Sequence, residues 1–130
     1  MRLEYFSADD SEQPGVVLIY EATIRQTRAL LDTLDTLRSG RPVDPILIEN
    51  LPGCEAIDGC SLALHRAEAD LGVHPDRDDP HHFSCTLSPE GWSHAWWMVE
   101  PFLVPKPGHF FQYLTRAGPT ELIFSTHRGW

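Results

Sequence analysis

Aromatic residues are concentrated in the last third of this 130-residue chain. Ten of its thirteen, including all four tryptophans, lie between Phe83 and Trp130. Within this stretch the hydrophobic pattern passes from alternation to helical spacing and then to two further apolar runs, which predicts the order strand, helix, strand, strand. Large aromatic side chains dominate the energetics of a core. We therefore expect the core to form around this part of the chain.

The helix in this stretch has recognisable ends. Residues 88–90, Ser-Pro-Glu, supply an N-cap, a proline in the first turn and an acid where the helix dipole favours one. Trp92 and Trp96 follow four residues apart, so we expect them to share one face and to decide how the helix docks on the core. Pro101 predicts that the helix ends near Glu100, because proline breaks the interior of a helix.

A second helix is predicted at about residues 24–39. Thr23 and Gln26 fit a capping box, in which each side chain accepts a hydrogen bond from the backbone N–H of the other residue. Gly40 is placed to end the helix, because a left-handed backbone is favoured there and glycine adopts it without strain.

The remaining apolar runs predict short strands. Their lengths and their β-branched or alternating residues are typical of buried and half-buried strands. They lie at residues 3–7, 16–20, 45–49, 83–87, 110–115 and 121–125. A Gly-Pro turn joins the last two, which predicts a hairpin.

Residues 54–75 leave two alternatives open. The runs 62–66 and 70–74 alternate between apolar and polar positions, as the two strands of a hairpin would. The alternative is a single helix over residues 62–71. A glycine within the second run and a proline directly after it favour the hairpin, because both residues interrupt helices.

Together these elements predict one α+β domain over residues 1–130. We expect a mostly antiparallel sheet of about seven or eight short strands, with two helices packed on one of its faces. A chain of this length can bury a sizeable core without disulfides.

The chain is acidic, with 19 Asp and Glu residues against 10 Lys and Arg and a formal net charge of −9. Such a surface repels nucleic acid and anionic membranes, and it favours a basic partner or serves only to keep the protein soluble. The first residues show no secretion signal, and the longest apolar run, Val16 to Tyr20, is too short to span a bilayer. Three cysteines, an odd number, do not indicate a disulfide framework. We therefore expect a cytoplasmic protein.

Common catalytic and cofactor motifs do not occur in the sequence. It has no G-x-S-x-G elbow, no G-x-G-x-x-G fingerprint, no phosphate-binding loop and no H-E-x-x-H zinc motif. We therefore predict no catalytic residues and no cofactor. Cys54, Cys60 and Cys85 are best interpreted as buried small apolar side chains.

Residues 74–82 combine three histidines and three aspartates in nine positions. If this segment joins two paired strands, His74 and His82 face each other across its mouth. Histidine and aspartate are common zinc ligands, which makes His74, His81 and His82 weak candidates for a metal site. Their spacing matches no known metal motif, so a solvated acidic loop is the favoured interpretation and no metal is predicted.

Trp97 is the candidate for an aromatic contact with a partner. Together with His94 it falls on the side of the second predicted helix that lies opposite Trp92 and Trp96. An exposed tryptophan is typical of a contact surface. The alternative is that this helix is covered on both sides.

Asp32 and Asp35 fall on the outer face of the first predicted helix. Arg28 and Arg38 lie four and three residues away from them, which predicts a lattice of surface salt bridges. Acids on loops and outer helix faces are the ones that a basic partner would meet. The predicted partner-binding residues are Asp32, Asp35, Asp76, Asp78, Asp79 and Trp97.

The end of the chain carries a recognisable pattern: residues 108–114 (Gly-His-Phe-Phe-Gln-Tyr-Leu), residues 121–125 (Glu-Leu-Ile-Phe-Ser) and Trp130. This pattern resembles the closing hairpin of some bacterial immunity proteins of polymorphic toxin and contact-dependent inhibition systems. The resemblance implies a small acidic cytoplasmic protein that binds and neutralises a cognate toxin domain, without enzyme activity or cofactor. It transfers no toxin-contact residue to this chain.

The favoured hypothesis is a non-enzymatic acidic binding protein, a monomer or homodimer, whose partner is a basic protein such as a toxin domain. Nucleic acid and membrane partners are not expected. A second hypothesis is a small-molecule- or metal-binding, enzyme-like domain with a pocket near His81, His82, His94 and Trp97. A third is a structural homo-oligomeric module that uses the aromatic C-terminal half as its interface.

Overall fold

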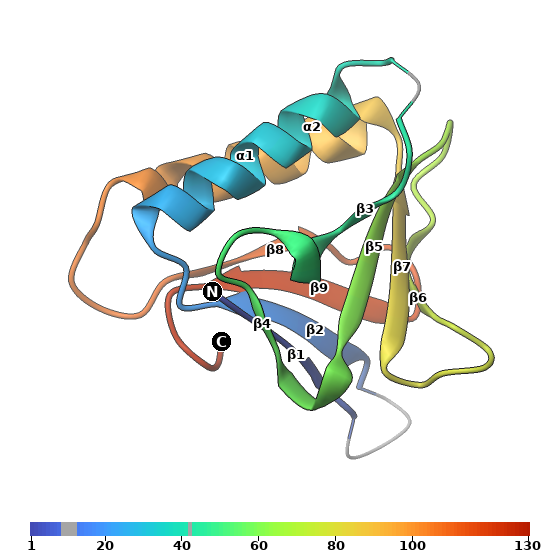
Figure 1. Ribbon diagram of the computed structural model, residues 1–130, viewed down its shortest axis with the longest axis horizontal. Coiled ribbons are helices and arrows are strands. Elements are labelled where there is room, and N and C mark those ends of the chain that lie inside the picture. Colours follow the sequence, from blue (N-terminus) through green and yellow to red (C-terminus); the bar gives the residue numbers. More distant parts are fainter. Residues whose placement is uncertain (9–12, 42) are drawn as a thin grey trace.

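A single curled sheet, covered on one side by two antiparallel helices, forms the architecture of the protein (Figure 1). The computed structural model describes residues 1–8, 13–41 and 43–130. Its strands are β1 (Arg2–Phe6), β2 (Gly15–Tyr20), β3 (Ile46–Leu47), β4 (Glu55–Ala56), β5 (Ser61–Arg66), β6 (Gly72–Pro75), β7 (His82–Leu87), β8 (Phe111–Thr115) and β9 (Thr120–Ser125). Its helices are α1 (Ile24–Arg38) and α2 (Pro89–Val99), with short 3-10 turns η1 (Ile48–Asn50), η2 (Ile57–Gly59) and η3 (Glu100–Leu103). The predicted α+β class is confirmed, and the number of described strands, nine, is close to the expected seven or eight.

The strand order is β3-β5-β7-β6-β9-β2-β1-β4, and β8 pairs with β9 beside this path. Within the described ranges five strand pairings are antiparallel and three, β1–β4, β2–β9 and β5–β7, are parallel. The sheet is therefore mixed, with antiparallel pairs in the majority. Its curl sets β5 and β7 at a steep angle to β1, β2 and β9, and the helices lie across the enclosed side (Figure 1).

Both helices begin and end as their sequences predict. Thr23 and Gln26 form the capping box of α1, and Gly40 follows this helix with a left-handed backbone at φ +82°. Ser88 caps α2 by accepting a hydrogen bond from the Gly91 backbone N–H, and α2 gives way to η3 just before Pro101. Neither described helix has the length and apolar character needed to cross a bilayer.

Neither the hairpin nor the single helix predicted within residues 54–75 is correct. Strands form over the two predicted runs, which makes the single helix wrong, but β5 and β6 are not partners in a hairpin. Strand β7 lies between them, parallel to β5 and antiparallel to β6. The buried apolar face of the sheet explains why β5 pairs with β7 rather than with β6. Leu62 and Leu64 of β5 lie beside Phe83 and Cys85 of β7 and extend one apolar row, whereas β6 offers only Val73 to that row.

The strand predicted at residues 45–49 is much shorter than expected. Only Ile46 and Leu47 pair, with β5, and Ile48 then turns into η1 with its side chain fully buried. A short strand of this kind limits the exposed edge of the sheet, where unpaired backbone groups invite association.

The core occupies both faces of the sheet. The larger part lies between sheet and helices and contains Trp92, whose ring is fully buried and whose Nε1 donates a 2.9 Å hydrogen bond to the His65 carbonyl. The smaller part, on the far face, is built from Leu18, Tyr20 and Ile123 with Val16. Strand β2 is therefore buried on both faces.

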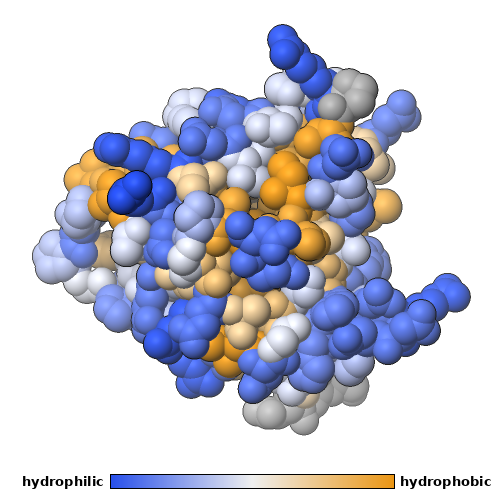
Figure 2. All heavy atoms as spheres, viewed as in Figure 1, coloured by the Kyte–Doolittle hydropathy of each residue, from blue (hydrophilic) through white to orange (hydrophobic). Residues whose placement is uncertain are grey.

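Some apolar side chains stay at the surface, among them those over the segment after α2, at the left of Figure 2.

Candidate functional site

The outer surface of the helix pair brings two predicted partner-binding residues together. Arg38 Nε lies 2.7 Å from Asp35 Oδ1, and the Arg38 guanidinium lies 4.2 Å above the centre of the Trp96 ring. The Trp96 and Trp97 rings meet edge to face, with their centres 4.9 Å apart. A chain of three contacts therefore links Asp35 on α1 to Trp97 on α2. We call Asp32, Asp35, Arg38, His94, Trp96 and Trp97 the helix-layer surface.

Trp97 is the most exposed aromatic side chain of this surface, with 58% of its area accessible. Glu90 and His94 precede it at helical spacing on the same exposed side of α2. Trp96 is partly buried, and its Nε1 is a buried donor without a hydrogen-bond partner among the described residues. Contact with the Trp96 ring restricts the Trp97 ring, which reduces the side-chain entropy that this ring would lose on entering a contact.

The charge of this surface is negative and only partly compensated. Asp35 is paired with Arg38, but Asp32, which is exposed, has no ion pair within the described chain. The lattice of salt bridges predicted from Arg28 and Arg38 is therefore reduced to one pair. Arg28 precedes Asp32, which is the less favourable order for an ion pair on a helix, whereas Asp35 precedes Arg38 in the favourable order.

The acids of the β6–β7 loop lie elsewhere. Figure 1 shows this hairpin loop projecting beyond the sheet, away from the helices. Asp76 Oδ1 accepts from the Asp78 backbone N–H at 2.9 Å, and Asp79 Oδ1 accepts from the His81 N–H at 2.9 Å. These two carboxylates order the loop, and Asp78 is exposed. The six predicted partner-binding residues thus form two separate negative regions rather than one.

The loop histidines do not converge. His74 pairs with Ser84 across the hairpin, so the prediction that His74 and His82 face each other is wrong. The six-residue loop between β6 and β7 sets this register and leaves His82 beyond the last pair. His82 Nε2 lies 3.4 Å from Asp79 Oδ2. Across residues 1–8, 13–41 and 43–130 there is no group of three or more His, Cys, Asp or Glu side chains that could hold a metal ion.

All three cysteines are free thiols. Cys60 and Cys85 are buried, and burial raises the pKa of each to about 12. Burial also raises the pKa of the half-buried Cys54. The interpretation as buried small side chains is confirmed for Cys60 and Cys85 and holds in part for Cys54. Because a thiol attacks as its thiolate, these groups are poorly suited to nucleophilic chemistry.

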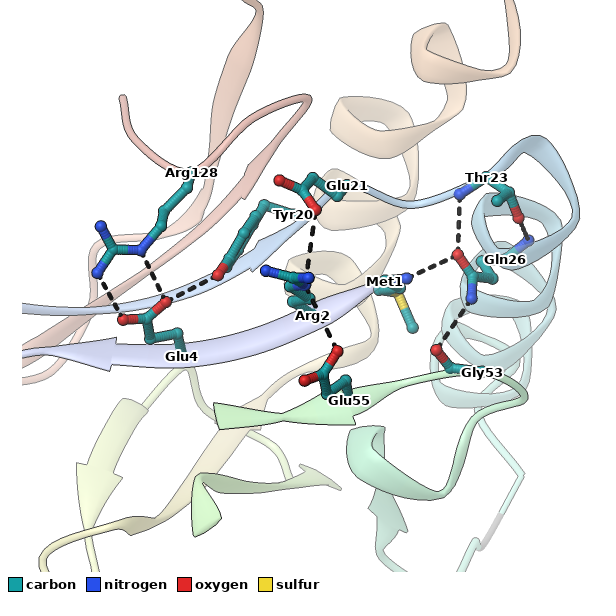
Figure 3. Close-up of polar contacts among 10 residues, drawn as sticks. All are labelled: Met1, Arg2, Glu4, Tyr20, Glu21, Thr23, Gln26, Gly53, Glu55 and Arg128. Atoms are coloured by element: carbon teal, nitrogen blue, oxygen red, sulfur yellow. Dashed lines mark hydrogen bonds and ion pairs between the residues drawn. The ribbon is translucent and has the colours of Figure 1, made fainter. Parts of the chain in front are cut away.

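A buried carboxylate lies on the sheet face that the helices leave open (Figure 3). Glu4 accepts hydrogen bonds from Arg128 Nε and Nη2 at 3.1 and 2.9 Å and from the Tyr20 hydroxyl at 2.8 Å. Hydrogen bonding to Arg128 lowers the pKa of Glu4, and burial raises the pKa of Tyr20. Arg128 also lies over the Phe6 ring. The cluster fastens the last residues of the chain to β1 and β2, which is a structural role.

Three further contacts in Figure 3 engage neighbouring polar groups. Arg2 lies 3.6 Å from Glu21 and 3.5 Å from Glu55. Gln26 donates to the Gly53 carbonyl at 3.1 Å and so joins α1 to the loop before β4. The carboxylates of this region are therefore engaged within the molecule, in contrast to Asp32.

An apolar cleft of about 440 Å³ opens at the other end of α2. It lies between the start of α1, the segment from η3 to residue 106, and strands β8 and β9. Its apolar walls are formed by Ile24, Phe102, Val104, Phe110, Phe111 and Phe124. Sequence reasoning missed this cleft, because it assigned Ile24 to the first predicted helix and the other lining residues to separate elements, among them the strands at 110–115 and 121–125. The sequence signal that could have indicated it is the set of apolar residues Val104, Phe110 and Phe111 around two prolines, all three of which are exposed in the structure.

A second cleft of about 360 Å³, lined by charged as well as apolar side chains, lies near the start of α2. Asp70, Glu90, His94 and Arg116 are among its lining residues, and Arg116 is held 2.6 Å from Glu121. Neither cleft is lined by Trp97, His81 or His82. The structure therefore does not place either cleft where the sequence reasoning expected a pocket, although His94 does line the second one.

Comparison with known proteins identifies no relative of this chain. No family model, no curated protein and no solved structure matches the chain.

Proposed function

We propose that this protein is a non-enzymatic binding protein that holds a basic protein partner on its helix-layer surface. The observation that carries this proposal is Trp97, a large aromatic side chain that is more than half exposed yet held in place by Trp96. Tryptophan is the residue type most enriched among those that dominate binding energy at protein interfaces.

The charge of the molecule supports a basic partner. The net charge is −9, and Asp32 and Glu90 are exposed carboxylates on α1 and α2 without ion pairs in the described chain. Opposite charge on a partner steers the encounter and raises the association rate. The acids of the β6–β7 loop add to the same long-range field, although they lie outside the helix-layer surface.

The partner that fits best is a toxin domain, with this protein as its immunity protein in the cytoplasm. The resemblance of residues 108–114 and 121–125 to the closing hairpin of such proteins supports this proposal, and so does the acidic composition. The cognate toxin would be positively charged, as nucleases that bind anionic substrates are. No cofactor takes part in this function, because inhibition needs only a complementary surface.

The test uses the protein encoded beside this chain in its genome as the candidate partner. We expect the wild-type protein to bind it and to relieve its toxicity during co-expression, and Trp97→Ala to weaken both. Leu71→Ala is the matched control, since Leu71 is 53% exposed and lies in the β5–β6 connection. Equal binding by wild type and Trp97→Ala would contradict the proposed surface. A wild-type homodimer that Trp97→Ala converts to monomer would instead support the homo-oligomeric alternative.

A further inference from the structure

We infer that the apolar cleft is a binding site for a small apolar carboxylate, which extends beyond the proposed protein-binding function. The cleft volume of about 440 Å³ lies within the range of about 300–1,000 Å³ that is typical of small-molecule sites. The site is separate from Trp97, which does not line it.

The floor of the cleft is preformed. The Phe102 and Phe124 rings pack edge to face with their centres 4.7 Å apart, and Phe124 is almost fully buried. Pro101 and Pro105 lie on either side of Phe102 and restrict the backbone of this wall. A ligand that enters such a site does not have to order the walls first, so less of its binding free energy is lost.

Most polar groups of the lining are already engaged. Thr23 Oγ1 accepts from the Gln26 backbone N–H, Thr27 Oγ1 donates to the Thr23 carbonyl, and Ser125 Oγ donates to the Gly129 carbonyl. In the part of the chain that the structure describes, the side chains of Lys106 and Gln112 have no such partner. These two side chains are the ones free to bind a polar group of a ligand.

The charge at the cleft has the opposite sign to that of the whole molecule. Lys106, the chain's single lysine, lines the cleft, and no aspartate or glutamate is among its described lining residues. Glu21, the carboxylate nearest in sequence to the α1 wall, is occupied by Arg2. The start of α1 adds a partial positive charge to the same wall. An apolar body with one negative group therefore complements the site.

The experiment measures binding of octanoate and of its uncharged analogue octanol by calorimetric titration. We expect saturable binding of octanoate with a Kd below about 1 mM. Lys106→Gln should weaken octanoate about five- to tenfold and leave octanol unchanged, because only the carboxylate uses the ammonium group. Arg77→Gln makes the same change in net charge on the β6–β7 loop and should alter neither affinity.

A second variant locates the ligand. Phe111→Ser removes part of an apolar wall from a half-exposed position and should weaken both ligands, whereas Trp97→Ala should weaken neither. The inference is overturned if octanoate does not bind the wild type, or if Phe111→Ser leaves its affinity unchanged. Equal octanoate affinity in Lys106→Gln and wild type overturns the assignment of a carboxylate. None of these outcomes depends on whether a protein partner binds at Trp97.

Discussion

The helix-layer surface and the apolar cleft share helix α1 but differ in shape and in charge. The first is an outer face with an exposed tryptophan and one unpaired acid, Asp32, and the second is a hollow with aromatic walls and one lysine. The difference arises from the residues directly after Trp96 in the chain. Trp97 continues the helix and faces outward, whereas Pro101 ends it and η3 directs Phe102 inward against Phe124.

This comparison teaches that net charge alone does not predict what an acidic protein binds. Long-range steering depends on the whole charge of −9, but the groups within a few ångströms of a ligand decide its chemistry. At the apolar cleft the nearest formal charge is positive. At the helix-layer surface Asp32 and Asp35 outnumber Arg38.

The largest effect is expected from Trp92→Ala, which removes the largest fully buried side chain of the core on which the helices pack. Trp92 is fully buried and donates a hydrogen bond to the His65 carbonyl, so the loss of its side chain should lower the free energy of unfolding by about 3–5 kcal/mol. Denaturant unfolding measures this change. Partner binding and octanoate binding should fall together, and retention of one alone would show that the two regions have independent supports.

Trp97→Ala should separate the two regions. The loss of binding to the basic partner is expected to be about 2 kcal/mol, a roughly thirtyfold rise in Kd, because an exposed aromatic anchor is truncated. The free energy of unfolding should change by less than about 0.5 kcal/mol, since the ring is largely outside the core. Calorimetric titration and denaturant unfolding of the same samples test both statements. A large loss of stability would mean that Trp97 mainly supports the fold.

Reversal of Asp76, Asp78 and Asp79 to lysine tests the long-range charge. Because these residues lie on a loop away from the helices, the triple variant should slow association with the basic partner about tenfold at low salt. The dissociation rate should hardly change, and the difference should shrink as salt is added. Stopped-flow fluorescence gives both rates. A changed dissociation rate would place the loop inside the interface.

The smallest effect is expected from Glu4→Gln and concerns stability rather than binding. Its bonds with Arg128 hold the pKa of Glu4 below its unfolded value, so this carboxylate stabilises the fold above the unfolded pKa. That contribution is lost as the pH falls through the folded pKa. The wild type should therefore exceed the variant in thermal stability near neutral pH, and the two should converge in acid. A difference that is constant with pH would show that packing, rather than charge, is lost.

Local features of the fold could be predicted because they depend on a few neighbouring residues. The capping box of Thr23 and Gln26, the Ser88 cap and the end of α2 before Pro101 each involve backbone groups within four residues. The outward position of Trp97 followed in the same way from its spacing to Trp92 and Trp96.

The pairing of β5 with β7 could not be predicted in this way. It depends on which distant strand continues the apolar row of Leu62 and Leu64, and the sequence offers several apolar strands with similar spacing. The register of His74 with Ser84 likewise depends on the conformation of the loop between them. The apolar cleft combines α1, η3, β8 and β9, so no single segment carries its pattern.

The pairing of β2 with β9 has a consequence for how the molecule is made. Gly15 lies beside Thr120, so the two strands are separated by 105 positions in the sequence. During synthesis β2 leaves the ribosome well before β9, so one of its hydrogen-bonding edges stays unpaired until β9, 105 positions further along, has also emerged. Closing a loop of this length costs conformational entropy before the two strands gain any stabilising contact, and this slows folding. The nascent chain is then most exposed to aggregation along β2, and a chaperone that shields this strand would raise the yield of folded protein.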